Sequence, residues 1–374
     1  MFSKTSEALV QRRARDRGTG FQPVLHGQEA HATRGFAKAS SSRFLPLLLA
    51  AAFSVSARGA PAPLRVVTTI PDLAAIAAAV GGQAVTVTSI AQGHENPHFL
   101  QARPTYIVQA RDADLWIRAG AELEVGWEPI VLDQARNRRI QPGQPGFLDG
   151  SAHVPVLREV PEGPVSRAQG DVHPSGNPHY LLDPLNARAI ARAIGARLAA
   201  LRPEQAAQFE AGADAFVREL DRRLFGADAL AAAPGDALAA QLEAGTLDDW
   251  AARQNVTLDG WWAELAPWRG RQLVTFHKSF TYFTQRFGLE VASELEPVPG
   301  VPPGPAHLAR VMQRMQDEQI GLILMEPFYP RKPADFVAAR TAARVAVVSS
   351  YAPDTQPEAY FRLIEAIIAA IKGP

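Results

Sequence analysis

Residues 271–295 read RQLVTFHKSFTYFTQRFGLEVASEL, and this stretch indicates the fold. Its apolar runs predict a strand over 271–277, a helix over 279–287 and a second strand over 289–295. Two strands joined through a helix lie parallel in one sheet. We therefore expect a parallel α/β sheet, with His277 at the carboxyl end of its first strand.

The same alternation continues on both sides of this stretch. Downstream, strands are predicted over 321–327 and 344–350, with helices over 305–317 and 332–342 and a closing helix from 359. Upstream, strands are predicted over 64–70, 84–90 and 114–120, with a weaker one over 154–160 inside a Gly- and Pro-rich loop, 135–178. Helices are predicted over 185–201 and 204–225. Two groups of about four strands predict two similar lobes rather than one large sheet.

Five segments follow from this pattern. We expect a signal peptide with an over-extended N-terminus (1–57), an N-terminal α/β lobe (58–203), a linking helix (204–226), a helical Trp-rich insertion (227–270) and a C-terminal α/β lobe (271–374). The insertion holds Trp250, Trp261, Trp262 and Trp268, whose rings we expect to pack against a lobe.

The N-terminal segment has the composition of an export signal. Residues 1–57 hold eight Lys or Arg and three acidic residues, and they end in the uncharged stretch FLPLLLAAAFSVSA. A basic region, a short apolar core and small residues at the cut are typical of a secretory signal. The basic region is unusually long, so we expect the true start to lie downstream of Met1. The remaining chain carries a net charge of −5, which argues against a nucleic-acid partner.

The chain contains no cysteine. It can therefore form no disulfide and carry no lipid on an N-terminal cysteine, and we expect a soluble periplasmic protein. Nothing in the sequence suggests an oligomer, so we expect a monomer.

Three histidines stand in distinctive settings: His98 in GHENPHFLQARP, His179 in HPSGNPHYLLDP and His277 in VTFHKSFTYF. His98 and His277 follow predicted strands, where open parallel sheets present ligands. Three imidazoles and a carboxylate suit Zn²⁺, and Mn²⁺ less well. Asp354 and Glu326 are the two candidates for the carboxylate. Glu326 could instead cap the following turn or pair with Arg331 or Lys332.

The other polar residues near these motifs have structural interpretations. Glu122 and Glu124 are expected to cap or form ion pairs, Asp183 to cap the next helix, and Tyr180 and Phe280 to pack around the site. Of the remaining histidines, His26 and His31 precede the apolar signal core, His94, His153 and His173 are expected to be solvated in loops, and His307 opens a helix.

Four segments together resemble the periplasmic zinc/manganese substrate-binding proteins of ABC transporters. They are GHENPHFLQARPTYIVQARDADLWIRAGAELEVGW (93–127), GNPHYLLDP (176–184), VTFHKSFTYFTQRFGLEV (274–291) and EPFYPRKPADFVAARTAARVAVVSSYAPD (326–354). The resemblance spans roughly residues 64–374, with the Trp-rich segment as an interruption. Because several motifs recur in the same order, the resemblance is specific.

The resemblance implies a receptor that captures Zn²⁺ between two lobes and delivers it to an ABC permease. It implies the ligands His98, His179 and His277, with Asp354 as the acidic ligand and Glu326 as its substitute. It also implies that the long linking helix limits hinge opening. The zinc members often carry a long His-rich loop, which this chain lacks.

Three alternatives stay open. A manganese receptor of the same family is the first. A zinc-dependent hydrolase with Glu326 as general base is the second, although no HExxH motif is present. A metal-buffering protein without a permease is the third. We favour zinc because imidazole ligands suit it, and we expect no catalysis.

Overall fold

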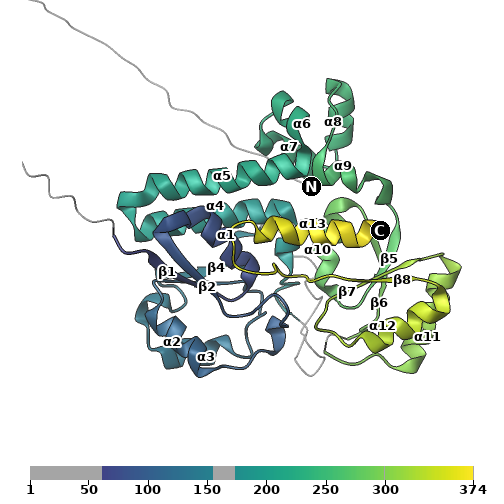
Figure 1. Cartoon of the computed structure of the whole chain (residues 1–374), viewed down its shortest axis with the longest axis horizontal. Helices are drawn as coiled ribbons and strands as arrows, with labels where there is room; N and C mark the ends of the chain where they lie inside the picture. Colours follow the sequence, from purple (N-terminus) through teal and green to yellow (C-terminus); the bar gives the residue numbers. More distant parts are fainter. Residues whose placement is uncertain (1–60, 155–172, 299, 374) are drawn as a thin grey trace, which may run out of the picture. The chain divides into compact units, whose positions relative to one another are not determined.

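The computed structural model describes residues 61–154, 173–298 and 300–373. The predicted signal peptide lies outside these residues, as does nearly all of the strand predicted over 154–160. The described chain holds two four-stranded sheets, each fully parallel and each flanked by helices (Figure 1). The predicted two-lobed α/β architecture is therefore confirmed.

The N-terminal sheet has the strand order β2-β1-β3-β4. Its strands are β1 (Leu64–Thr68), β2 (Val85–Ser89), β3 (Leu115–Arg118) and β4 (Phe147–Asp149). The first three match the predicted strands. The fourth was wrongly assigned to a loop, because three residues carry no periodic signal and Pro145 and Gly146 precede them. β4 pairs with β3 only along Trp116–Arg118.

The C-terminal sheet has the equivalent order β6-β5-β7-β8. Its strands are β5 (Gln272–Thr275), β6 (Glu290–Glu294), β7 (Leu322–Met325) and β8 (Arg344–Val347). In both sheets the chain reverses its direction of winding after the second strand. In open α/β sheets, ligands bind beyond the carboxyl ends of the strands at this reversal.

Helices cover both faces of the sheets. They are α1 (Pro71–Gly81), α2 (Pro104–Asp112), α3 (Glu128–Ala135), α4 (Pro184–Leu201), α5 (Ala206–Phe225), α10 (Thr281–Phe287), α11 (Pro305–Asp317), α12 (Arg331–Thr341) and α13 (Ala359–Lys372). Proline stands at the start of most of these helices, where its missing N–H costs no hydrogen bond. Among the described residues, no helix is both long and apolar enough to span a membrane.

One apolar core joins residues of both lobes. It includes Leu73 of α1, Ile194 of α4, Phe216 of α5 and Ile364 of α13, together with side chains of both sheets. Two further cores lie on the other faces of the sheets, one under α2 and α3 and one under α11 and α12. Because α5 and α13 share the large core, the lobes are joined by packed side chains as well as by the chain itself.

The segment 227–270 contains four short helices. It contains α6 (Ala227–Ala232), α7 (Gly235–Glu243), α8 (Leu247–Gln254) and α9 (Gly260–Glu264). The ring centroid of Trp261 lies 6.5 Å from that of Phe361 on α13. The ring centroid of Trp262 lies 6.4 Å from that of Phe287 on α10. These two indoles therefore pack against helices that border the C-terminal sheet.

Candidate metal centre

The three predicted histidine ligands come together in the structure. Ligand nitrogens of His98, His179 and His277 all lie within 4.8 Å of one another. Their side chains are buried, with exposed fractions of 9%, 6% and 4%. Ring centroids are 5.4 Å apart for His98 and His179, 6.0 Å for His98 and His277, and 5.9 Å for His179 and His277.

These spacings suit a common metal ion. A Zn–N bond is about 2.0 Å long, and the centroid of an imidazole ring lies about 1.2 Å beyond its bound nitrogen. Two imidazoles on one tetrahedral zinc ion therefore have centroids about 5 Å apart. The Nε2 atoms of His98 and His179 already face each other at 3.4 Å. Small ring movements would let both atoms reach one ion.

The same local hydrogen bond positions His98 and His179. Each ends an Asn-Pro-His tripeptide, and the Asn side chain accepts the backbone N–H of the histidine. Asn96 Oδ1 lies 3.1 Å from the His98 nitrogen, and Asn177 Oδ1 lies 2.9 Å from that of His179. The proline between them fixes the backbone φ, so side-chain and backbone constraints act together. This repeated tripeptide is a sequence signal beyond the Pro-His pair on which the prediction relied.

Asn177 also ties the second histidine to the third. Its Nδ2 donates to the Lys278 carbonyl at 2.8 Å, and its own carbonyl accepts from the Tyr282 hydroxyl at 2.8 Å. Lys278 directly follows His277, which lies just beyond the end of β5. The ligands of the two lobes are therefore connected by hydrogen bonds as well as by proximity.

Glu296 contacts a candidate ligand, and the sequence did not predict it. Its Oε2 lies 2.7 Å from Nδ1 of His277, and its Oε1 accepts the Gly300 N–H at 3.0 Å. A carboxylate at Nδ1 places the proton there and leaves Nε2 as the metal-binding atom. Only its position could have indicated Glu296, because it lies just beyond the end of β6, and β6 is the neighbour of β5, the strand that His277 follows.

His179 is oriented in a similar way. The Tyr351 hydroxyl lies 3.2 Å from its Nδ1, on the side away from His98. Burial is the largest cause that lowers the pKa of His179 well below 6.5, and the nearby imidazoles of His98, His277 and His173 add to it. His179 is therefore neutral at physiological pH, which is the state that binds a metal.

The two candidate carboxylates differ sharply in position. Glu326 directly follows β7, next to β5 in the sheet, and its side chain is fully buried. Burial raises its pKa to about 7, opposed mainly by His277 and Ser279. Within the described residues neither carboxylate oxygen has a hydrogen bond of good geometry. A buried carboxylate of this kind could hold a cation.

Asp354 lies at the surface instead. Its side chain is 44% exposed, and both oxygens accept from Arg362 on α13 at 2.8 Å. One oxygen also accepts the Gln356 N–H. These bonds satisfy the carboxylate and anchor the start of α13. Neither Asp354 nor Glu326 lies within the 4.8 Å group of the three histidines.

His173 does not occupy the solvated position expected for it. Its ring centroid lies 5.0 Å from that of His98, and both ring nitrogens are buried. The sequence HPSG forms a turn in which the Gly176 N–H donates to the His173 carbonyl at 3.0 Å. Proline at the second turn position favours this geometry, so the turn returns His173 towards the site.

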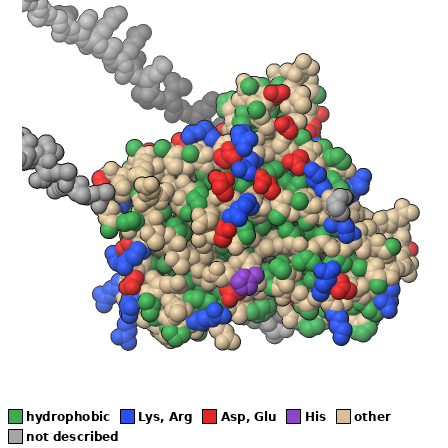
Figure 2. Space-filling view, viewed as in Figure 1, with side chains coloured by type: hydrophobic (Ala, Val, Ile, Leu, Met, Phe, Trp, Pro, Cys, Tyr) green, Lys and Arg blue, Asp and Glu red, His purple; other side chains and the backbone are tan. Residues whose placement is uncertain are grey.

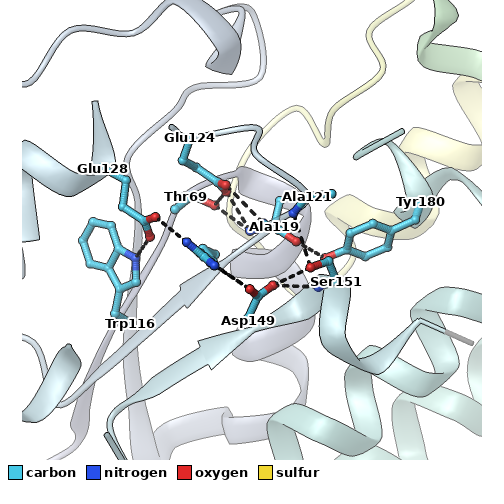
Figure 3. A network of polar contacts seen from close by, with 11 residues as sticks. Thr69, Trp116, Ala119, Ala121, Glu124, Glu128, Asp149, Ser151 and Tyr180 are labelled. Atoms are coloured by element: carbon cyan, nitrogen blue, oxygen red, sulfur yellow. Dashed lines mark hydrogen bonds and ion pairs between the residues drawn. The ribbon is translucent and has the colours of Figure 1, made fainter. Parts of the chain in front are cut away.

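A polar network that includes Tyr180, the residue after His179, is drawn in Figure 3. Glu124 accepts from the Thr69 hydroxyl and from the backbone N–H groups of Ala119 and Gly120. The Tyr180 hydroxyl donates to the Ala119 carbonyl at 2.8 Å. The expected capping role of Glu124 is therefore present, and through Tyr180 the network holds the residue after His179 against the end of β3.

Asp183 caps α4 as expected, through a bond from the Leu185 N–H at 2.9 Å. It also has a partner in the second lobe. Arg286 on α10 donates to both of its carboxylate oxygens, at 2.8 and 2.7 Å. The two side chains are only 2% and 10% exposed. This buried ion pair joins α4 to α10 a few residues after His179.

Comparison with known proteins agrees with this geometry. The family model described as "Zinc-uptake complex component A periplasmic" matches residues 66–241 and 248–373, which include most of the segment expected to be an insertion. The high-affinity zinc uptake system protein ZnuA of Yersinia pestis is 25% identical over 80% of this chain and 84% of its own. That of Brucella abortus is 25% identical, with 52% of this chain and 48% of the relative aligned. The chain thus spans about half the length of that relative.

Solved structures share the fold. A ZnuA crystal structure superposes with a TM-score of 0.57 at 18% identity, over 82% of this chain and 98% of that one. The substrate-binding protein FpvC of Pseudomonas aeruginosa, in complex with Mn²⁺, gives 0.56 at 18% identity, over 83% of this chain and 98% of that one. By the extent of the family match, this chain belongs to the family of periplasmic zinc-uptake component A proteins.

Proposed function

We propose that this protein is a periplasmic receptor that binds Zn²⁺ at the three-histidine centre and delivers it to an ABC permease for import. One observation carries the proposal: three buried imidazoles from two lobes lie at ligand spacing beyond the carboxyl ends of the sheets. Family membership and the zinc-uptake proteins among its relatives support it. Export to the periplasm and the permease partner are part of the proposal.

We propose Glu326 as the fourth ligand. It is the better of the two carboxylates because it is buried and lacks a good hydrogen bond among the described residues, whereas Asp354 is exposed and paired with Arg362. A dication next to Glu326 would offset the cost of burying its charge. In this proposal Glu296 and Tyr351 orient His277 and His179.

The donor set favours zinc over manganese. Imidazole nitrogen suits Zn²⁺, and Mn²⁺ binds more weakly than Zn²⁺ at a site with several nitrogen donors. Manganese-bound structures of the same fold exist, so the cargo must be measured directly. A zinc hydrolase is the less favoured function, because catalytic zinc keeps an open position for water and Glu326 would close the site.

The proposal is tested by titrating the purified, metal-stripped protein with Zn²⁺ and Mn²⁺ by calorimetry. We expect one zinc ion per chain, much weaker manganese binding, and severe loss of zinc affinity in His277→Ala. Glu326→Ala should weaken zinc binding, whereas Asp354→Ala should leave it unchanged. Absence of stoichiometric zinc binding would overturn the proposed function, and a larger effect of Asp354→Ala than of Glu326→Ala would reverse the choice of carboxylate.

On the face drawn in Figure 2, acidic and basic side chains are interspersed. A permease that docks on that face would therefore meet charged side chains of both signs. Import is tested in a strain that lacks its own zinc receptor, by growth in zinc-depleted medium with and without this chain. Growth that depends on the chain and on His277 supports delivery to a permease.

A further inference from the structure

We propose that His173 is a fourth imidazole ligand of the metal, so that nitrogen donors outnumber the single carboxylate four to one. This inference rests on the proposed function, because it concerns the same ion. It assigns a role to a histidine outside the predicted ligand set.

His173 lies next to the site. Its ring nitrogens are outside the group of His98, His179 and His277, whose ligand atoms lie within 4.8 Å of one another, so its ring would turn towards the ion on binding. Its ring centroid is 5.0 Å from that of His98, which is closer than any spacing within the three-histidine group. The spacing expected for two imidazoles on one zinc is also about 5 Å. Both ring nitrogens are buried although the residue as a whole is only half-buried.

The local backbone supports the same conclusion. The turn from His173 to Gly176 is closed by a 3.0 Å hydrogen bond, and Gly176 takes a φ of 107° that other residues rarely adopt. Asn177 then fixes His179. His173 and His179 are therefore presented by one short, hydrogen-bonded segment. Little chain entropy is lost when both imidazoles bind the same ion.

A fourth imidazole has a chemical consequence. Zn²⁺ has no geometric preference from its d electrons, so its shell can accept a fifth donor beside Glu326. Each added nitrogen strengthens binding of Zn²⁺ more than binding of Mn²⁺, which prefers oxygen ligands. His173 would therefore increase the discrimination between the two metals.

The test is X-ray absorption at the zinc edge of the zinc-loaded protein, which counts imidazoles through their multiple-scattering signal. We expect four imidazoles in the wild type and three in His173→Ala. Competition with a chromophoric chelator should show zinc affinity lowered at least about tenfold in the variant, since even the outer partners of ligands change affinity by about 10- to 100-fold. Manganese affinity should fall less.

His153→Ala is the matched control, because His153 is exposed and should leave both measurements unchanged. A second variant, His173→Asp, replaces nitrogen with oxygen and should shift the ratio of affinities towards Mn²⁺. Three imidazoles and an oxygen donor in both wild type and His173→Ala would overturn the role of His173 and leave the proposed function intact. A wild-type protein that binds no zinc would instead overturn the proposed function.

Discussion

Glu296→Gln should lower zinc affinity although the two side chains have nearly the same shape. In the wild type, the two carboxylate oxygens perform separate tasks: Oε2 accepts from Nδ1 of His277, and Oε1 accepts the Gly300 N–H. Glutamine has one oxygen and one NH₂ group, so it can accept from only one of these donors. With its oxygen on Gly300, its NH₂ group faces Nδ1 of His277. The imidazole must then carry its proton on Nε2, the metal-binding atom.

The magnitude follows from the hydrogen bonds. To bind zinc in this variant, His277 must move its proton back to Nδ1, where the N–H then faces the NH₂ group of the introduced glutamine. One of these two buried donors is left unsatisfied, which costs about 1–3 kcal/mol. Zinc affinity should therefore fall by about 5- to 150-fold, since about 1.4 kcal/mol corresponds to a factor of ten. Glu296→Ala removes the acceptor but introduces no opposing donor. We expect it to weaken zinc binding less than Glu296→Gln does.

The assay is competition against a chromophoric zinc chelator at pH 7.5. Glu290→Gln serves as the matched control, because Glu290 lies exposed at the start of the same strand, β6. Circular dichroism of the metal-free proteins would show that each variant is folded. Zinc affinity of Glu296→Gln within a factor of two of wild type would refute the assignment of Glu296 as the residue that sets the His277 tautomer.

Three further predictions concern the scaffold and the pH response. Arg286→Met should lower the free energy of unfolding by about 3–5 kcal/mol in urea titrations, because it leaves Asp183 buried and unpaired, and Asp183→Ala in the same background should restore part of the loss. Burial raises the pKa of Asp72 from 3.8 to about 7, so this group destabilises the fold increasingly as pH rises from about 4 to 7. Asp72→Asn keeps an acceptor for the Ala352 N–H but cannot ionise. Its stability advantage over wild type should therefore grow by about 2–3 kcal/mol as the pH rises from about 5 to 8. Zinc affinity should fall below pH 6, because imidazole ligands must be neutral to bind the metal. The pKa of His179 is lowered, so His179 should take up no proton when zinc is released at pH 7. Calorimetry at several pH values measures both effects.

Most of the fold was predictable because long apolar runs alternate with amphipathic helices. The stretch 271–295 forms β5, α10 and β6 close to the predicted bounds. β4 was missed because a strand of three residues at a sheet edge has too few side chains to show a period. Its pairing with β3 is a long-range contact that no local pattern encodes.

The site was predictable only in part, for a similar reason. His98, His179 and His277 stand in motifs, and strand ends converge in a parallel sheet. Glu296 and His173, the two residues that we propose to add, carry no motif of their own, because strand pairing places Glu296 and a turn places His173. The preference for Glu326 over Asp354 depends on burial, which arises from packing of β7 between its neighbours and cannot be read from nearby residues.

The contacts between the lobes limit how the metal can enter and leave. Wide opening would break the Asp183–Arg286 ion pair, which is buried in this structure. It would also break the bonds from Tyr282 to Asn177 and from Tyr360 to Leu181, at about 1 kcal/mol each. Metal exchange is therefore expected to proceed through local movement of side chains at the site rather than through wide opening of the lobes.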